Sequence, residues 1–178
     1  MIVMQVVIEG LEPGLLQHRC PDMLEGTTKA IKYKDLSEEA EATTYRLSNG
    51  NLYQPAEHLE RAMISAAGMF KIGRRSAAGV AAAAFYVTPR QIDHGTNTYE
   101  IDKRTVVIRS TGGRIMRARA LLYPWSLTFE IGIDETLIQP DMAREILETA
   151  GQQKGIGDFR PEKKGRFGKF VVKDWSRV

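Results

Sequence analysis

A glycine-rich basic stretch lies between a helix pattern and a strand pattern, and this order constrains the fold more than any other feature. The stretch spans residues 151–170 and reads GQQKGIGDFRPEKKGRFGKF. Residues 140–150 before it predict a helix, and residues 169–175 predict a strand. A dinucleotide-binding glycine loop joins a strand to a helix in the opposite order, and no GxxxxGK[ST] motif occurs. The sequence therefore excludes both familiar nucleotide-cofactor loops.

The composition of this loop is typical of a loop that binds the phosphate backbone of a nucleic acid. Glycine lets a backbone approach a ligand closely, and successive N–H groups form a concavity that holds an anion. Basic side chains add charge, and a phenylalanine offers a ring on which a base can stack. A mobile surface loop of the same composition is the alternative interpretation. The residues predicted to bind nucleic acid here are Lys154, Gly155, Gly157, Arg160, Lys163, Lys164, Arg166 and Phe167.

Charge is segregated along the chain, although the net charge is only +3. Residues 103–119 contain basic side chains and no acidic one, whereas residues 35–41 are acidic. Such segregation is expected of a polyanion binder with an acidic back. The further residues predicted to contact nucleic acid are Arg74 and Arg75 in a glycine loop, and Lys103, Arg104, Arg109, Arg114, Arg117 and Arg119 in an extended hairpin arm.

The order of predicted elements favours an α+β fold with an antiparallel sheet. Strands are expected at residues 1–9, 81–88, 125–133 and 169–175, and helices at 55–70 and 140–150. Residues 99–110 and 114–122 predict the two strands of the basic hairpin arm. Residues 37–42 predict a helical turn capped by Ser37, and Asn49–Gly50 predicts a tight hairpin. Without the insertions at about 10–54 and 89–124, the order is β-α-β-β-α-β, a ferredoxin-like single domain over residues 1–178.

This order, the glycine-rich loop between the second helix and the last strand, and the inserted basic hairpin together resemble the RAMP superfamily. Those proteins have a ferredoxin-like fold and build CRISPR effector complexes. The resemblance implies single-stranded RNA or DNA bound along the sheet and loop, often by many copies side by side. It implies either a backbone-like subunit, with a homo-oligomer or other effector subunits as partners, or a stand-alone relative.

We expect a non-catalytic binder, and the sequence predicts no cofactor, no metal site and no catalytic residue. Cys20 is the only cysteine, and no HExxH or GxSxG motif occurs. His18, His58 and His94 are far apart in sequence. One alternative is a metal-independent endoribonuclease, which needs one of these histidines beside the loop, with a lysine or tyrosine nearby. A protein-only assembly subunit is the other. The alternating N-terminus predicts no signal peptide, which favours a soluble cytoplasmic protein.

Overall fold

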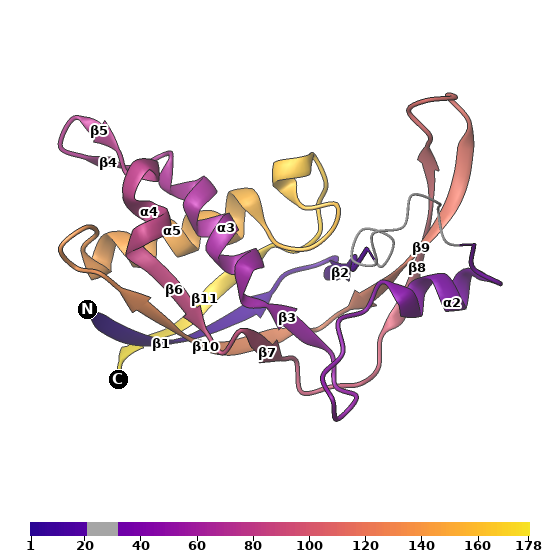
Figure 1. Ribbon diagram of the computed structural model, residues 1–178, viewed down its shortest axis with the longest axis horizontal. Coiled ribbons are helices and arrows are strands. Elements are labelled where there is room, and N and C mark those ends of the chain that lie inside the picture. Colours follow the sequence, from indigo (N-terminus) through magenta and orange to yellow (C-terminus); the bar gives the residue numbers. More distant parts are fainter. Residues whose placement is uncertain (21–31) are drawn as a thin grey trace.

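The largest sheet of the protein is antiparallel and has β1 and β10 at its centre (Figure 1). The computed structural model describes residues 1–20 and 32–178, and within them the chain is an α+β protein with antiparallel sheets and four α-helices. The strand order is β11-β1-β10-β6. These strands are β1 (Ile2–Gly10), β6 (Phe85–Thr88), β10 (Ser126–Ile133) and β11 (Phe170–Arg177). The strands expected at 1–9, 125–133 and 169–175 are confirmed, with their ends shifted by one or two residues.

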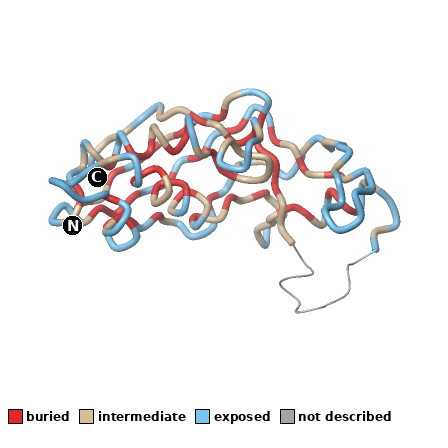
Figure 2. The backbone as a smooth tube through the Cα atoms, turned by 90° about the horizontal axis from the view of Figure 1, so that it is seen from above, coloured by how far each residue is buried: buried red, intermediate tan, exposed pale blue. Residues whose placement is uncertain are grey.

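Two amphipathic helices, α3 (Ala56–Ala67) and α5 (Pro140–Thr149), cover one face of this sheet (Figure 1). Alternate residues of β1, from Ile2 to Ile8, are buried beneath them. Leu59 and Met63 of α3 and Leu147 of α5 are fully buried in the same core. Buried segments run along the middle of the molecule in Figure 2. The helix predicted at 55–70 ends earlier, because Gly68 caps α3.

The other face of the sheet is open. The side chains that alternate with the core, including Gln5 and Glu9 of β1 and Thr128 and Glu130 of β10, are exposed. An antiparallel sheet with one solvated face shows this alternation of apolar and polar residues. The site described below is placed relative to these two faces.

The alanine-rich run before β6 is a helix, so the strand predicted over residues 81–88 is wrong in its first half. Helix α4 spans Ala78–Ala84, and β6 begins only at Phe85. Alanine has the highest intrinsic helix propensity, and its small side chain gains little in a strand. Helix α4 packs beside α3, and Ala81 and Ala84 are the buried contacts.

The basic arm is confirmed as a long hairpin. Strands β8 (Glu100–Val107) and β9 (Arg114–Leu122) pair from Glu100–Leu121 to Val107–Arg114. Its turn is closed by the Ile108 N–H, which donates to the Gly113 carbonyl at 2.8 Å, so β8 is shorter than predicted. Strand β2 (Leu15–Gln17) pairs with the base of β9. The arm therefore projects from a three-stranded sheet beside the main one (Figure 1).

The early insertion differs from its prediction, and its residues 21–31 lie outside the described part of the chain. Helix α2 (Leu36–Ala42) is capped by Asp35, not Ser37, because the Asp35 carboxylate accepts the Glu38 N–H at 2.8 Å. The predicted hairpin at Asn49–Gly50 is a turn with one isolated bridge between Arg46 and Leu52. The remaining short strands are β3 (Tyr53–Pro55), which pairs with β7 (Gln91–Asp93), and β4 (Lys71–Ile72), which pairs with β5 (Arg75–Ser76).

Candidate nucleic-acid interface

The glycine-rich loop is folded tightly against β2. After α5 the chain forms a π-turn, η1 (Ala150–Lys154), and later a 3₁₀ turn, η2 (Pro161–Lys163), before β11. The Asp158 N–H donates to the Leu16 carbonyl at 2.9 Å. Gly157 has a φ of +79°, and a Cβ there would lie 2.4 Å from the same Leu16 oxygen. Glycine is therefore required for packing at this position, where the sequence suggested approach to a ligand.

The loop satisfies much of its own backbone. The Gly155 N–H donates to the Ala150 carbonyl, and the Gly165 N–H donates to the Arg160 carbonyl. The Phe167 N–H donates to the carbonyl of Phe159. The sequence predicted that N–H groups of this loop form a concavity that holds an anion. These three N–H groups are bound to carbonyls instead, so the prediction is wrong for them.

A cation on the arm joins the arm to the loop. The Arg104 guanidinium carbon lies 4.4 Å from the ring centroid of Phe167 and 5.9 Å from that of Phe159. Phe167 is 4% exposed and therefore cannot act as the predicted stacking platform for a base. Phe159 remains partly exposed and lines a groove of about 610 Å³ together with Arg104 and Val106 of β8. The arm and the glycine-rich loop thus both line this groove, the loop through Phe159.

Four of the predicted cations are already paired with carboxylates. Arg119 binds Asp158 of the loop at 3.0 Å and lies 3.6 Å from the buried Glu39 of α2, which also pairs with Arg117 at 3.2 Å. Arg104 pairs with Asp102, and Arg160 with Glu162. Phosphate must compete with these partners. The acidic segment at 35–41 supplies one of these partners, Glu39. The sequence predicted that this segment lies on an acidic face away from the basic surface. That prediction is wrong for Glu39, which packs against the arm.

The remaining cations of the loop and arm that were predicted to bind nucleic acid form no ion pair within the described residues. Most are exposed, and Lys154 is half-buried. They come from η1, from η2 and the residues just after it, and from both strands and the tip of the arm. These seven are Lys103, Arg109, Arg114, Lys154, Lys163, Lys164 and Arg166.

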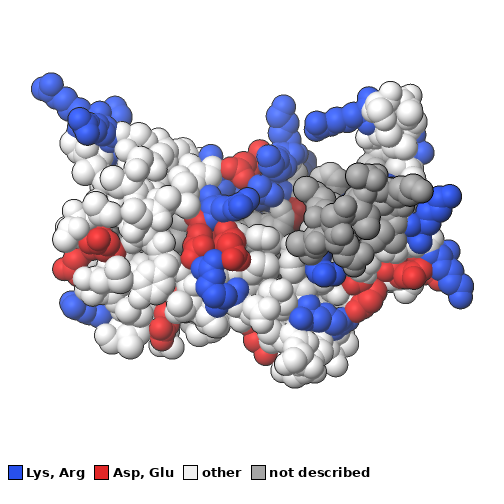
Figure 3. Space-filling view, viewed as in Figure 1, with Lys and Arg blue, Asp and Glu red and all other residues white. Residues whose placement is uncertain are grey.

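Arg74 and Arg75 lie at the other end of the molecule. They belong to the β4–β5 hairpin beyond α3, which is far from the arm in Figure 1. Figure 3 shows the same separation between basic side chains at that end and those over the loop and arm. The prediction that these two arginines assist the loop is therefore wrong. The open sheet face is not basic either, since it exposes Glu9 and Glu130, and Glu9 pairs with Lys173 at 3.4 Å.

Two of the three histidines meet beside the loop. His18 and His58 line a pocket of about 220 Å³ together with Tyr45, Arg160 and Asp158. Nδ1 of His18 lies 3.5 Å from Asp158 Oδ2. His58 extends from the first turn of α3, where the Gln54 amide donates to its Nδ1. The third histidine, His94, lines a different pocket.

Both histidines of this pocket favour the neutral form. Burial, helped by the nearby Arg160, lowers the pKa of His58 to about 4. Burial and then Arg119 lower the pKa of His18, and Asp158 opposes them in part. Burial raises the pKa of Tyr45 to about 12, so its hydroxyl stays protonated. The pocket therefore offers two neutral imidazoles near a guanidinium, and the Tyr45 hydroxyl beside them donates to the His18 carbonyl at 3.5 Å.

Sequence reasoning did not bring these groups together. It treated His18 and His58 as separate residues, and it did not single out Tyr45 or Asp158. No local motif connects them, because they come from the residue after β2, the segment after α2, helix α3 and the glycine-rich loop. Only the packing of the loop onto β2 could have indicated the cluster.

Within residues 1–20 and 32–178, no group of three His, Cys, Asp or Glu side chains is arranged to hold a metal ion. Among the same residues, no helix has the length and apolar content needed to cross a membrane. No protein-family model matches the sequence, and a search of curated proteins gave no match.

Proposed function

We propose that this protein binds single-stranded nucleic acid, RNA in preference to DNA, in the groove between the glycine-rich loop and the β8–β9 arm. The observation that carries the proposal is the contact of Arg104 with the rings of Phe167 and Phe159, which joins the arm to the glycine-rich loop at one groove. Phe159 offers a partly exposed ring for a base, and the cations of the loop and arm that have no ion-pair partner in the described chain attract phosphates. Recognition of backbone and ring faces is tolerant of sequence, so the binding is expected to have little base preference.

A ferredoxin-like fold is part of this proposal. The order β11-β1-β10-β6, with α3 preceding β6 and α5 preceding β11, supports it once the arm and early insertion are set aside. The loop and arm support kinship with the RAMP superfamily, as a backbone-like subunit or a stand-alone relative. In the first case, copies of the chain or other effector subunits assemble along the strand. Light scattering with and without an oligonucleotide measures that assembly.

Salt dependence tests the binding directly. Each neutralised phosphate contributes a slope of about −0.7 to log K against log salt for a single strand. Replacing Lys163, Lys164 and Arg166 by alanine should therefore reduce the slope by about 2. The matched control replaces Lys71, Arg74 and Arg75, which removes the same charge from the far hairpin. Fluorescence anisotropy with labelled RNA and DNA of one sequence gives both slopes.

Equal effects of the two triple variants would show that net charge, and not this groove, governs binding. A salt-independent affinity would refute a phosphate grip altogether. If neither RNA nor DNA binds, and the protein still assembles with itself, the arm is a protein-interaction element without nucleic acid.

A second candidate function is metal-independent RNA cleavage, and one observation favours it. His18, His58, Tyr45 and Arg160 surround one pocket whose wall is the glycine-rich loop. In such a reaction a neutral imidazole takes the proton of a 2′-hydroxyl as its oxygen forms a bond to phosphorus. The P–O5′ bond breaks, and the Tyr45 hydroxyl protonates the leaving oxygen. The Arg160 guanidinium stabilises the charge that develops on the phosphoryl oxygens.

End-labelled RNA incubated in EDTA tests this candidate. Cleavage should leave a 2′,3′-cyclic phosphate, should spare DNA of the same sequence, and should be lost in both His18→Ala and His58→Ala. Intact RNA after long incubation with the wild-type protein, under conditions in which it binds, leaves binding as the sole activity of the groove and pocket.

A further inference from the structure

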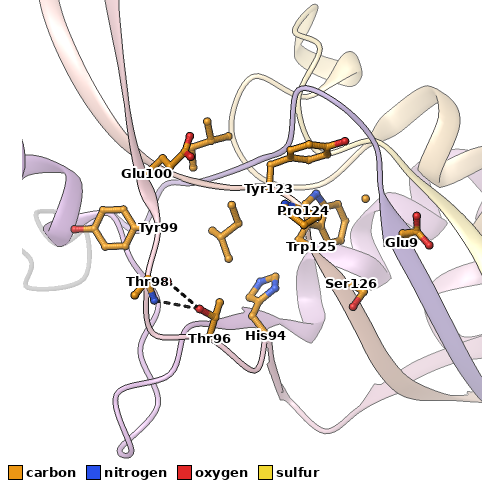
Figure 4. A pocket seen from close by; sticks show the side chains of 13 residues that line it. Glu9, His94, Thr96, Thr98, Tyr99, Glu100, Tyr123, Pro124, Trp125 and Ser126 are labelled. Carbon is orange, nitrogen blue, oxygen red and sulfur yellow. Dashed lines mark hydrogen bonds between the residues drawn. The ribbon is translucent and has the colours of Figure 1, made fainter.

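A second and larger pocket lies at the base of the arm, where the open sheet face meets the β7–β8 connection. Its volume is about 600 Å³. In Figure 4, Tyr123 lies on one side of it and His94 on the opposite side, with Trp125 between them beside Pro124. Thr98 and Glu100 lie along one side, and Glu9 lies on the other (Figure 4). The pocket is separate from the groove and from the His18–His58 pocket, with which it shares no lining residue.

Three buried nitrogen atoms in this pocket have no hydrogen-bond partner within residues 1–20 and 32–178. They are Nδ1 and Nε2 of His94 and Nε1 of Trp125. Trp125 is 5% exposed, and its indole lies directly over Gly10, where a Cβ would be 2.0 Å from Nε1. The two rings meet edge to face with centroids 6.3 Å apart. Buried polar atoms are nearly always paired in native structures, so three beside one pocket mark it as a place for a polar partner.

The charge of the pocket limits what that ligand is. Among the described residues no lysine or arginine lines it, and Glu9 and Glu100 contribute carboxylates, of which Glu9 pairs with Lys173 outside the lining at 3.4 Å. The Glu100 carboxylate and the absence of a lining cation in the described chain disfavour a phosphate in its interior. Burial lowers the pKa of His94 to about 4, so its ring is neutral and offers one donor and one acceptor. The indole adds a second donor. The ligand that fits is uncharged and carries donors and acceptors on one edge.

We propose that this pocket holds a single unstacked nucleobase with an exocyclic amino group, such as cytosine. Tyr123 is 45% exposed at the mouth and offers a ring face for stacking. The His94 and Trp125 nitrogens pair with the ring nitrogen and carbonyl of the base, and the Glu100 carboxylate accepts from its amino group. The base comes either from a free nucleoside or from a strand bound in the groove, and only the second source rests on the proposed function.

Tryptophan fluorescence tests the proposal in a Trp175→Phe background, in which Trp125 is the sole reporter. Cytidine should quench this fluorescence and should bind at least about tenfold more tightly than uridine, because only cytidine presents an amino donor. Glu100→Gln should bring the two affinities close together, since an amide accepts from one base and donates to the other. The matched control is Glu130→Gln, which removes the same charge from the open sheet face outside the pocket.

His94→Phe separates a ligand site from a structural histidine. It keeps a ring and removes both unpaired nitrogens, so the melting temperature should stay level or rise while cytidine binding is lost. A lower melting temperature would mean that the nitrogens are satisfied in the free protein, and the proposal would then fail. It also fails if cytidine and a cytosine-containing oligonucleotide both leave the fluorescence unchanged.

Two further experiments identify the source of the base. Quenching by free cytidine at high salt, where phosphate contacts are weak, assigns the site to nucleosides and is independent of the groove. Quenching only by an oligonucleotide, and its loss with the Lys163, Lys164 and Arg166 triple variant, assigns the base to the bound strand. If the protein binds cytidine but no oligonucleotide, the proposed function is refuted and the nucleobase site proposed here is supported.

Discussion

Gly168→Ala is the substitution that most directly tests whether the glycines of the loop are structural. Gly168 has a φ of +73°, and a Cβ there would lie 1.7 Å from the Ile156 carbonyl oxygen. Because that neighbour is backbone, no side-chain movement can relieve the clash. The loop must shift as a whole.

The expected loss of stability follows from the backbone conformation and the hydrogen bonds that this shift disturbs. Alanine in the left-handed region costs about 1 kcal/mol. The Gly168 N–H donates to the Gly14 carbonyl at 2.8 Å, and the Gly168 carbonyl accepts from the Ile156 N–H at 3.0 Å. Losing both hydrogen bonds costs about 1 kcal/mol each, so the total is about 3 kcal/mol. For a domain of this size, that corresponds to a melting temperature lower by roughly 6–12 °C.

Gly73→Ala is the matched control. Gly73 also has a positive φ, +61°, but a Cβ there would meet nothing within 4 Å. It should therefore lose only the conformational term of about 1 kcal/mol, or roughly 2–4 °C. Calorimetry and anisotropy below both melting temperatures measure stability and nucleic-acid affinity. Only Gly168→Ala should weaken binding, because it moves Phe159 and Phe167 away from Arg104. Equal losses of stability in the two variants would refute a packed, structural loop.

Three further perturbations follow from single contacts. Arg104→Ala should lower the free energy of unfolding in urea by about 1 kcal/mol through the lost cation–π contact, whereas Lys103→Ala on the opposite side of the strand should leave it unchanged. Glu39→Gln should destabilise the protein by about 2 kcal/mol yet strengthen nucleic-acid binding, since it releases Arg117 and Arg119 from a buried carboxylate; weaker binding would contradict this role. Below pH 6.5 the unfolded chain binds a proton at His58 that the folded protein does not bind until about pH 4. Stability should therefore fall as pH drops through this window, by up to about 3 kcal/mol, and the fall should be smaller in His58→Gln when unfolding is followed in urea across pH.

Much of the fold could be predicted because its signals are local. The alternation in residues 1–9 and 125–133 reflects one buried face, and the stripe in residues 140–150 reflects helix packing. The alanine run from Ala78 to Ala84 was harder, because small apolar residues carry no periodic contrast. There, intrinsic propensity decided the outcome in favour of a helix. The Asn49–Gly50 turn formed, but the strands around it found other partners, since Tyr53–Pro55 pairs with β7.

The candidate site was only partly predictable, because its chemistry depends on contacts between distant segments. The sequence identified the loop and the arm as basic. It could not indicate that Arg104 would cover Phe167, or that Asp158 would lie between Arg119 and His18. Each contact joins residues about 40 or more positions apart in the chain. Local composition carries no information about which charges such packing neutralises.

That neutralisation changes the physical expectation for binding. Counting every cation predicted from the sequence as a phosphate contact gives a salt slope of about −9 on a single strand. Two of those cations lie at the far hairpin, and four are held by carboxylates. The seven cations of the loop and arm without such a partner in the described chain support a slope no steeper than about −5. A slope near −9 would require the Asp102, Glu39, Asp158 and Glu162 pairs to open and the far hairpin to fold back onto the strand. The measured slope therefore shows whether the ion pairs persist when nucleic acid is bound.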